Sequence, residues 1–238
     1  MNDLKNNYVY KLNDYQKEEK KPIVSDIMFH TMFNNESRKK YICFFLSNIL
    51  NISYRKIYDK IIFANVTLDK IGYYESKKIV DLLVKIDDEY INVEMNSYYS
   101  KNRIYRNFHY LTKIFSKDMR IGSKYKYNKV IQININNYNM EDKKEEYMMR
   151  TKKGKELMKE FEIINICLPK IRKKMYNKEK LSKLEKFLLI ANEKDEELCK
   201  FLAGDEKIMN EYLEESKKVS KEENLLNEYT KEQEDEMI

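Results

Sequence analysis

The stretch that decides the fold is IVDLLVKIDDEYINVEMN, residues 79–96. Its side chains alternate between two faces, as in β-strands, and a turn at Asp87-Asp88 predicts a hairpin. One predicted face is apolar and comprises Val80, Leu82, Val84, Ile86, Ile91, Val93 and Met95. A two-residue turn places Asp81 directly opposite Glu94, with Cβ atoms about 5 Å apart. Two carboxylates this close repel each other, and a divalent cation is the simplest compensation. The hairpin therefore predicts half of a metal site.

Composition limits the class of protein. The chain has 238 residues, of which 36% are charged and 42% hydrophobic, so one large domain or one domain with an appendage is expected. No apolar run approaches the roughly 20 residues of a membrane span, and the N-terminal segment lacks the apolar stretch of a secretory signal. Three widely spaced cysteines predict reduced thiols in a cytoplasmic protein. Only two histidines are present, which argues against a histidine-rich metal centre.

The charge of the chain is uneven. The net charge is +6, but residues 205–238 contain 12 Asp and Glu against 5 Lys, which leaves +13 on the rest. A basic body suits a polyanionic partner such as nucleic acid. The abundance of Lys, Asn, Ile and Tyr is also what AT-rich coding produces, so the charge alone does not identify the partner.

Few Gly and Pro interrupt the chain, so long helices are expected. The patterns predict helices over 26–33, 36–50, 101–117, 141–160 and 171–216, and strands over 61–66, 78–96, 129–135 and 161–167. In the helix over 101–117, the predicted apolar stripe comprises Ile104, Phe108, Leu111 and Phe115. A basic stripe beside it comprises Arg103, Arg106, Tyr110, Lys113 and Lys117. It could contact phosphates, or it could be an ordinary solvated helix face.

An ordered set of local patterns resembles the PD-(D/E)XK nuclease superfamily, and more closely its Rpn-type group of recombination-promoting nucleases and transposases. The matching patterns are Asp26-x-x-Phe29 followed by Phe33, Asp81 within 80–85, Glu94 within 91–96, Arg106-x-x-x-Tyr110, Gly122-x-x-Tyr125, and 161–170. The resemblance covers about residues 24–215. It implies an α/β fold with a restriction-endonuclease-like core, in which helices flank a mixed central sheet. We expect this core over 22–170, between a flexible N-terminus (1–21) and a helical C-terminal region (171–216) with an acidic tail (217–238).

The resemblance also assigns the site. It implies a Mg²⁺ site, with Mn²⁺ as a substitute, held by Asp81, Glu94 and the Val93 carbonyl. Asp26 is either a third acid near the metal or a cap of its own helix, where Ser25 competes for that role. Asn96 stands where the group has Gln and the superfamily has Lys, so it lacks a positive charge. Lys85 shares the face of Asp81 and could supply that charge, although it lies about 13 Å along the strand.

The function implied is a Mg²⁺-dependent DNA endonuclease linked to recombination, mobile elements or defence. Arg103, Arg106, Tyr110 and Lys113 are the expected DNA contacts. A homodimer is compatible with this function, because cutting both strands of a duplex needs two sites. The alternative is a catalytically attenuated nucleic-acid-binding or interaction protein that keeps the fold, and Asn96 is its main support.

Overall fold

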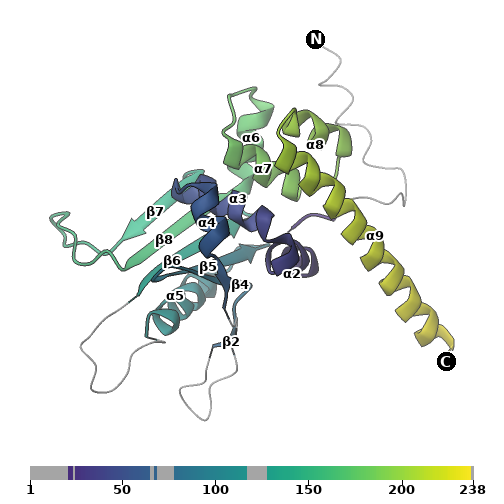
Figure 1. Cartoon of the computed structure of the whole chain (residues 1–238). Helices are drawn as coiled ribbons and strands as arrows, with labels where there is room; N and C mark the ends of the chain where they lie inside the picture. The colour runs from purple at the N-terminus through teal and green to yellow at the C-terminus, as the bar shows by residue number, and fades with distance from the viewer. Residues whose placement is uncertain (1–20, 24, 65–66, 69–77, 117–127, 237–238) are drawn as a thin grey trace.

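A mixed sheet of six strands lies at the centre of the molecule, in the order β1-β4-β5-β6-β8-β7 (Figure 1). The computed structural model describes residues 21–23, 25–64, 67–68, 78–116 and 128–236. The strands are β1 (Ile62–Phe63), β4 (Leu82–Ile86), β5 (Glu89–Asn96), β6 (Lys129–Asn136), β7 (Lys144–Met148) and β8 (Phe161–Cys167). The central strands β5, β6 and β8 are parallel, whereas β4 and β7 run antiparallel to their neighbours. The predicted α/β fold with a mixed sheet is confirmed.

Helices cover both faces of this sheet. They are α2 (Asp26–Phe33), the 3-10 helix η1 (Glu36–Arg38), α3 (Lys39–Leu50), α4 (Tyr54–Lys60), α5 (Lys101–Ser116), α6 (Leu168–Tyr176), α7 (Lys183–Asn192), α8 (Glu196–Ala203) and α9 (Lys207–Glu236). A short separate pair is formed by β2 (Thr67–Leu68) and β3 (Lys78–Ile79). Within the described residues, no helix combines the length and the apolar character needed to cross a membrane.

The main core lies between one face of the sheet and helices from both ends of the chain. At its centre, the Phe33 ring of α2 lies 6.2 Å from Phe45 of α3, 6.2 Å from Phe187 of α7 and 6.1 Å from Tyr212 of α9. The same buried cluster includes the apolar side chains on one face of β4, β5 and β6. Val219, well into α9, also belongs to it. The sheet and the C-terminal helices are therefore packed around one continuous core.

The register of the β4–β5 hairpin is as predicted. Ile86 pairs with Glu89 and Leu82 pairs with Val93, so residues of the two strands pair as a turn at Asp87-Asp88 requires. The predicted apolar face holds from Leu82 onward, but the placement of Val80 on it is wrong. Val80 packs instead in the smaller cluster under α5, because β4 begins only at Leu82 and the strand alternation does not extend back to it.

Helix α5 lies against the opposite face of the sheet and is rotated relative to the prediction. Ile104 and Phe108 of the predicted inner stripe are 67% and 49% exposed. Leu111 of the predicted stripe is buried, and Phe115 packs against the same cluster. The buried residues of the helix are Arg103, Asn107, Tyr110, Leu111, Lys113 and Ile114. The cause is the sheet face below, which carries polar side chains at alternate positions of β5 and β6. Asn107 donates a hydrogen bond to Asn134 at 2.8 Å, and such bonds are needed because buried polar groups are costly when unpaired.

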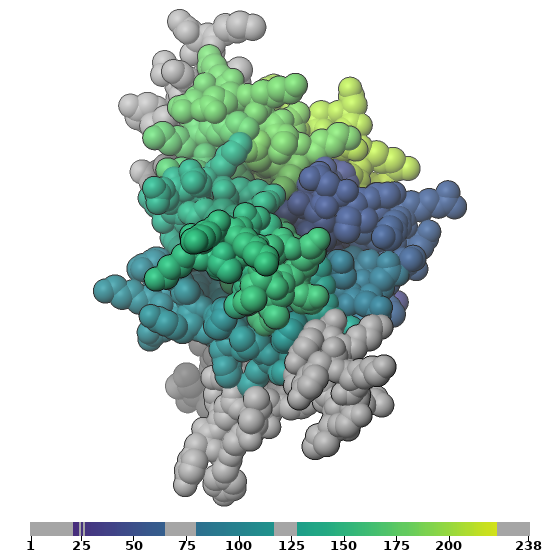
Figure 2. Space-filling view, turned by 90° about the vertical axis from the view of Figure 1, so that its left-hand side faces the viewer, coloured from purple at the N-terminus to yellow at the C-terminus, as the bar shows by residue number. Residues whose placement is uncertain are grey.

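The predicted helix over 141–160 is also wrong. The chain forms β7 there, which pairs with β8 at the edge of the sheet, followed by a bridge between Arg150 and Glu156. Figure 2 looks onto this edge, where the green segment between the two strands lies at the centre of the view. Lys and Glu favour helices as isolated residues, but pairing with the exposed backbone edge of β8 outweighs that preference. Charged side chains are also the common protection of an edge strand.

The structure also differs from the sequence-based predictions at shorter elements. Helix α4 was not predicted. Of the expected strand over 61–66, the structure describes residues 61–64, and β1 covers Ile62–Phe63 among them. The C-terminal region is helical, and α9 extends to Glu236 within the expected acidic tail. Residues 1–20, Lys117 and the Gly122-x-x-Tyr125 pattern lie outside the described residues.

Candidate active site

Asp81 and Glu94 meet at one end of the β4–β5 hairpin. Asp81 directly precedes β4, and its backbone N–H donates to Glu94 Oε1 at 3.3 Å. In return, Asp81 Oδ2 accepts a hydrogen bond of 2.8 Å from the backbone N–H of Met95, the residue after Glu94. Each carboxylate is thus held by the backbone of the other strand. The sequence predicted this pairing from the register alone.

The environment of Glu94 disfavours its negative charge. The side chain is only 2% exposed, and burial raises its pKa to about 8, with the Asp81 charge acting in the same direction. Arg106 and the Asn92 amide lower the pKa, but they do not outweigh burial. The pair therefore does not hold two full negative charges at neutral pH without a further cation. This is the electrostatic signature expected of a carboxylate site that binds a metal ion.

Arg106 of α5 is the cationic side chain that contacts this site. One of its terminal nitrogens (Nη2) lies 3.5 Å from Glu94 Oε2 and donates to Asn96 Oδ1 at 3.2 Å. The same nitrogen also reaches Asn107 Oδ1 at 3.3 Å, and the guanidinium lies 5.6 Å from the centre of the Tyr110 ring. The side chain is 40% exposed, so it links the buried carboxylate to solvent. The rotation of α5 is what brings it here.

A network of amides supports Glu94 from below. Asn92 donates to both Glu94 Oε1 (3.2 Å) and Gln132 Oε1 (2.8 Å). Gln132 donates to Asn134 at 2.9 Å, and Asn134 donates to Asn165 at 2.8 Å. The chain of bonds crosses β5, β6 and β8, and its members on β5 and β6 are buried. Such a network fixes side chains in one arrangement, because every broken bond would leave a buried polar atom unpaired.

Comparison with known families decides the identity of this scaffold. A family model described as PD-(D/E)XK nuclease family transposase matches residues 23–237. The chain belongs to this family. No curated protein and no solved structure matches it. A nuclease-like or transposase-like role follows from the PD-(D/E)XK membership.

The donors at the pair suit the divalent metal that PD-(D/E)XK nucleases generally use. Among the described residues, no group of three or more His, Cys, Asp or Glu side chains is placed to hold a metal. Mg²⁺ does not need such a group, because it is usually bound through one or two carboxylates, with water and substrate phosphate completing its shell. Asp81 and Glu94 provide the two carboxylates, and oxygen is the ligand atom that Mg²⁺ prefers. The residues present therefore fit the metal.

The two other predicted metal ligands are the Val93 carbonyl, which lies next to the pair, and Asp26, which lies farther away. Val93 sits within the ladder between Leu82 and Ile133, whereas the backbone contact with Asp81 is made by Met95. Helix α2 reaches the site through Asn34, which donates to the Asp81 carbonyl at 3.3 Å. Asp26 begins that helix about 12 Å away along its axis, at 1.5 Å per residue. The side chain of Asp26 is outside the described part of the structure, so its role stays a prediction. Ser25 is the N-cap residue but makes no side-chain cap bond.

Of the two polar side chains predicted to assist the reaction, Asn96 lies at the pair and Lys85 does not. Asn96 lies at the pair, where its Nδ2 donates to Asn136 at 2.8 Å and its Oδ1 accepts from Arg106. Lys85 is directed elsewhere, with its amine 5.1 Å from the centre of the Tyr90 ring. The structure thus brings Arg106, rather than Lys85, to the carboxylates.

The expected DNA-binding stripe is mostly covered. Arg103 and Lys113 are each 8% exposed, and the Arg103 guanidinium lies 4.5 Å from the centre of the Tyr98 ring. Tyr110 is also buried, so Arg106 is the most accessible member of the four. Sequence analysis missed the contact of Arg106 with Glu94 and the amide network. A signal for the network was present in KVIQININ (129–136), where polar residues occupy alternate positions of an apolar strand.

Proposed function

We propose that the protein is a Mg²⁺-dependent DNA endonuclease that hydrolyses phosphodiester bonds, in recombination, in mobile elements or in defence. The observation that carries this proposal is the Asp81–Glu94 pair on a PD-(D/E)XK scaffold, in which Glu94 is buried, Asp81 is half-buried and the pKa of Glu94 is raised to about 8. Burying a carboxylate next to a second one destabilises a fold unless the pair binds something. A divalent cation and the phosphate of DNA together satisfy that requirement.

Asp81 and Glu94 would hold Mg²⁺, with Mn²⁺ as a substitute. When bound, such an ion polarises a phosphate and activates water for hydrolysis. Met95 is a better candidate for a carbonyl ligand than Val93. Its N–H faces Asp81, and the N–H and C=O of one residue in an extended strand point to the same side.

Arg106 supplies the positive charge that Asn96 lacks. Its half-exposed guanidinium is held by Glu94, Asn96 and Asn107, so it can bind a phosphate oxygen without being reoriented first. Asn96 is a positioning residue in this scheme. It holds Arg106 through its Oδ1 and is itself fixed by Asn136. Neither Asn96 nor Lys85 is required as a base.

The experiment is metal-dependent cleavage of labelled duplex and single-stranded oligonucleotides by the purified full chain. Asp81→Asn should abolish cleavage, since it removes one of the two carboxylates. The matched control is Asp87→Asn at the exposed hairpin turn, where the carboxylate pairs only with lysines. Equal loss of activity in both variants, or no loss in Asp81→Asn, would show that the pair is not the reaction centre.

One observation favours a second candidate, a catalytically attenuated DNA-binding protein. Arg106 already partly neutralises Glu94, and an arginine can replace a metal as counter-ion. This candidate predicts salt-sensitive DNA binding without metal-dependent cleavage. Asn96→Gln and Asn96→Lys distinguish the two, because a gain of cleavage from an inert parent indicates an attenuated nuclease. A cytoplasmic location and a homodimer that cuts both strands belong to the same proposal.

A further inference from the structure

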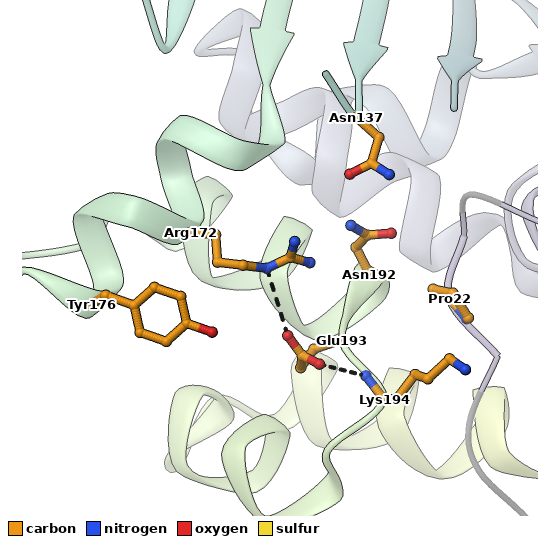
Figure 3. Close-up of a pocket in the computed structure, with 7 residues that line it drawn as sticks. All are labelled: Pro22, Asn137, Arg172, Tyr176, Asn192, Glu193 and Lys194. Carbon is orange, nitrogen blue, oxygen red and sulfur yellow. Dashed lines mark hydrogen bonds and ion pairs between the residues drawn. The ribbon is translucent and has the colours of Figure 1, made fainter. Parts of the chain in front are cut away.

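A polar pocket lies beyond the carboxyl ends of the parallel strands. Its volume is about 350 Å³, and its lining includes Asn137, Arg172, Tyr176, Asn192 and Glu193. Figure 3 shows Arg172 of α6, Asn137 at the end of β6 and Asn192 at the end of α7 converging on the same space. Small ligands commonly bind in pockets of this size and at this edge of an α/β sheet.

Two polar atoms in this pocket lack hydrogen-bond partners. Asn192 is 7% exposed, yet its Oδ1 accepts no hydrogen bond. Arg172 Nε is also buried without one, and its nearest ionic partner, Glu193 Oε2, is 3.8 Å away, too far for a hydrogen bond. Buried polar groups are rarely left unpaired in native proteins, and the exceptions call for an explanation. Both residues line the pocket, so a ligand that offers a donor to Asn192 Oδ1 and an acceptor to Arg172 Nε explains the two atoms.

The pocket adjoins the proposed reaction centre. The backbone N–H of Asn137 donates to the carbonyl of Asn96 at 2.8 Å, so the two sites share a strand end. Glu94 lies two residues before Asn96, which is about 7 Å along the strand at 3.3 Å per residue. A nucleic-acid strand that places a phosphate at the carboxylates can therefore reach the pocket with a neighbouring nucleotide.

The chemistry of the pocket selects which part of a nucleotide fits. A phosphodiester has only acceptor atoms, so it cannot satisfy Asn192 Oδ1, and it would be repelled by the Glu193 carboxylate. The edge of a nucleobase carries donors and acceptors side by side, which matches Asn192 Oδ1 and Arg172 Nε. Tyr176, 62% exposed at the rim, offers a ring for stacking. The Watson–Crick edge of a base is such an edge, and only an unpaired base presents it, because the partner base occupies it in a duplex.

We propose that this pocket binds an unpaired base of the substrate strand, next to the scissile phosphate. The substrate is then single-stranded or locally unpaired DNA, or a duplex from which one nucleotide is flipped out. This inference rests on the proposed nuclease function for the position of the strand. The convergence of Asn192 and Arg172 on the pocket carries it.

The test is an abasic scan with labelled single-stranded oligonucleotides. In each oligonucleotide one base is removed, and the full chain is assayed for cleavage with Mg²⁺ and for binding by fluorescence anisotropy in EDTA. We expect one position, close to the cut, at which loss of the base weakens binding about tenfold, as stacking and edge contacts typically contribute. In Asn192→Leu, binding of the intact oligonucleotide should fall by the same factor, and removal of that base should have no further effect. Asn177→Leu, at the exposed end of α6, should behave like the parent.

The outcomes separate the two proposals. A base-dependent position in the binding assay, without metal-dependent cleavage, would support the pocket and reject the nuclease. Cleavage that is unaffected by the position of the abasic site, or an Asn192→Leu variant that binds like the parent, would overturn the pocket proposal. The backbone of a bound peptide would then be the better chemical match. If Asn192→Leu melts early, Arg172→Met provides the same comparison from the other side of the pocket.

Discussion

Replacing Glu94 with glutamine should stabilise the metal-free protein at neutral pH. The change keeps the shape of the side chain and removes its ability to ionise. In the unfolded chain, Glu94 loses its proton near the ordinary pKa of 4.5, whereas in the folded protein burial and Asp81 hold the proton up to about pH 8. Between these values the folded state binds more protons than the unfolded state, so stability falls as pH rises.

The size of the effect follows from that difference. At pH 7, which is 2.5 units above the unfolded pKa of 4.5, Glu94 is protonated in the folded protein and ionised in the unfolded chain. At 1.36 kcal/mol per pH unit, keeping this proton costs the folded protein on the order of 3 kcal/mol. Glutamine avoids this cost, so the gain in the free energy of unfolding should be near zero at pH 4.5 and about 3 kcal/mol at pH 7. For a chain of 238 residues, this corresponds to a rise in Tm of about 6 °C.

The assay is thermal unfolding of the parent and Glu94→Gln in EDTA, between pH 4.5 and 8. Glu89→Gln, at the start of the same strand, is the control and should not show the pH-dependent gain. Mg²⁺ should then stabilise the parent and leave Glu94→Gln nearly unchanged, because the ion binds only the ionised pair. A gain that is absent at pH 7, or equally large at pH 4.5, would refute the claim that Glu94 is buried and protonated.

Other variants test separate parts of the structure. Arg106→Gln should lower kcat for cleavage by about 10²- to 10³-fold with little change in KM, because it removes a donor that stabilises charge in the transition state. Arg106→Lys should recover part of the lost kcat, and a change in KM alone would contradict this role. Asn107→Ala should lower the free energy of unfolding by about 1–3 kcal/mol, because it leaves buried partners unpaired, and a neutral effect in urea unfolding would reject the network. Asn192→Leu should raise Tm slightly while it removes base dependence, since it deletes an unpaired buried oxygen; a lower Tm would mean that the oxygen has a partner. If the acidic tail covers the basic body, deleting residues 223–238, which carry a net charge of −5, should raise DNA affinity at low salt. Unchanged affinity would show that the tail does not cover it.

The hairpin could be predicted because its register depends on local features. Alternation along residues 79–96 and a two-residue turn are enough to set Asp81 opposite Glu94. The same reasoning failed at Val80, two residues before the first residue of β4, where the chain leaves strand geometry. The register thus places Asp81, the residue next to the strand, but not the residue before it.

The orientation of α5 could not be predicted from its own sequence. Its apolar residues favour burial of Ile104 and Phe108, but the helix packs on a sheet face that carries amides and Glu94. Polar residues of the helix then satisfy polar residues of the sheet, and this term depends on contacts between segments far apart in the chain. The contact of Arg106 with the carboxylates follows from that rotation, so it too was beyond local analysis.

The prediction of a helix where β7 forms failed for a related reason. The Lys and Glu residues of β7 match a helix in isolation, and only the neighbouring backbone of β8 makes a strand preferable. The strand of 161–167 was predicted with its observed bounds, since its apolar run and the proline that follows it are local signals.

The most direct measurement is cleavage of supercoiled plasmid by the purified full chain, with Mg²⁺, with Mn²⁺ and with EDTA, beside the double variant Asp81→Ala/Glu94→Ala. A nuclease that uses this pair will nick or linearise the plasmid with either metal, and both EDTA and the double variant will prevent cleavage. Plasmid that stays intact with both metals, yet shifts on a gel in a salt-dependent way, would contradict catalysis at the pair and establish a DNA-binding protein on the nuclease fold.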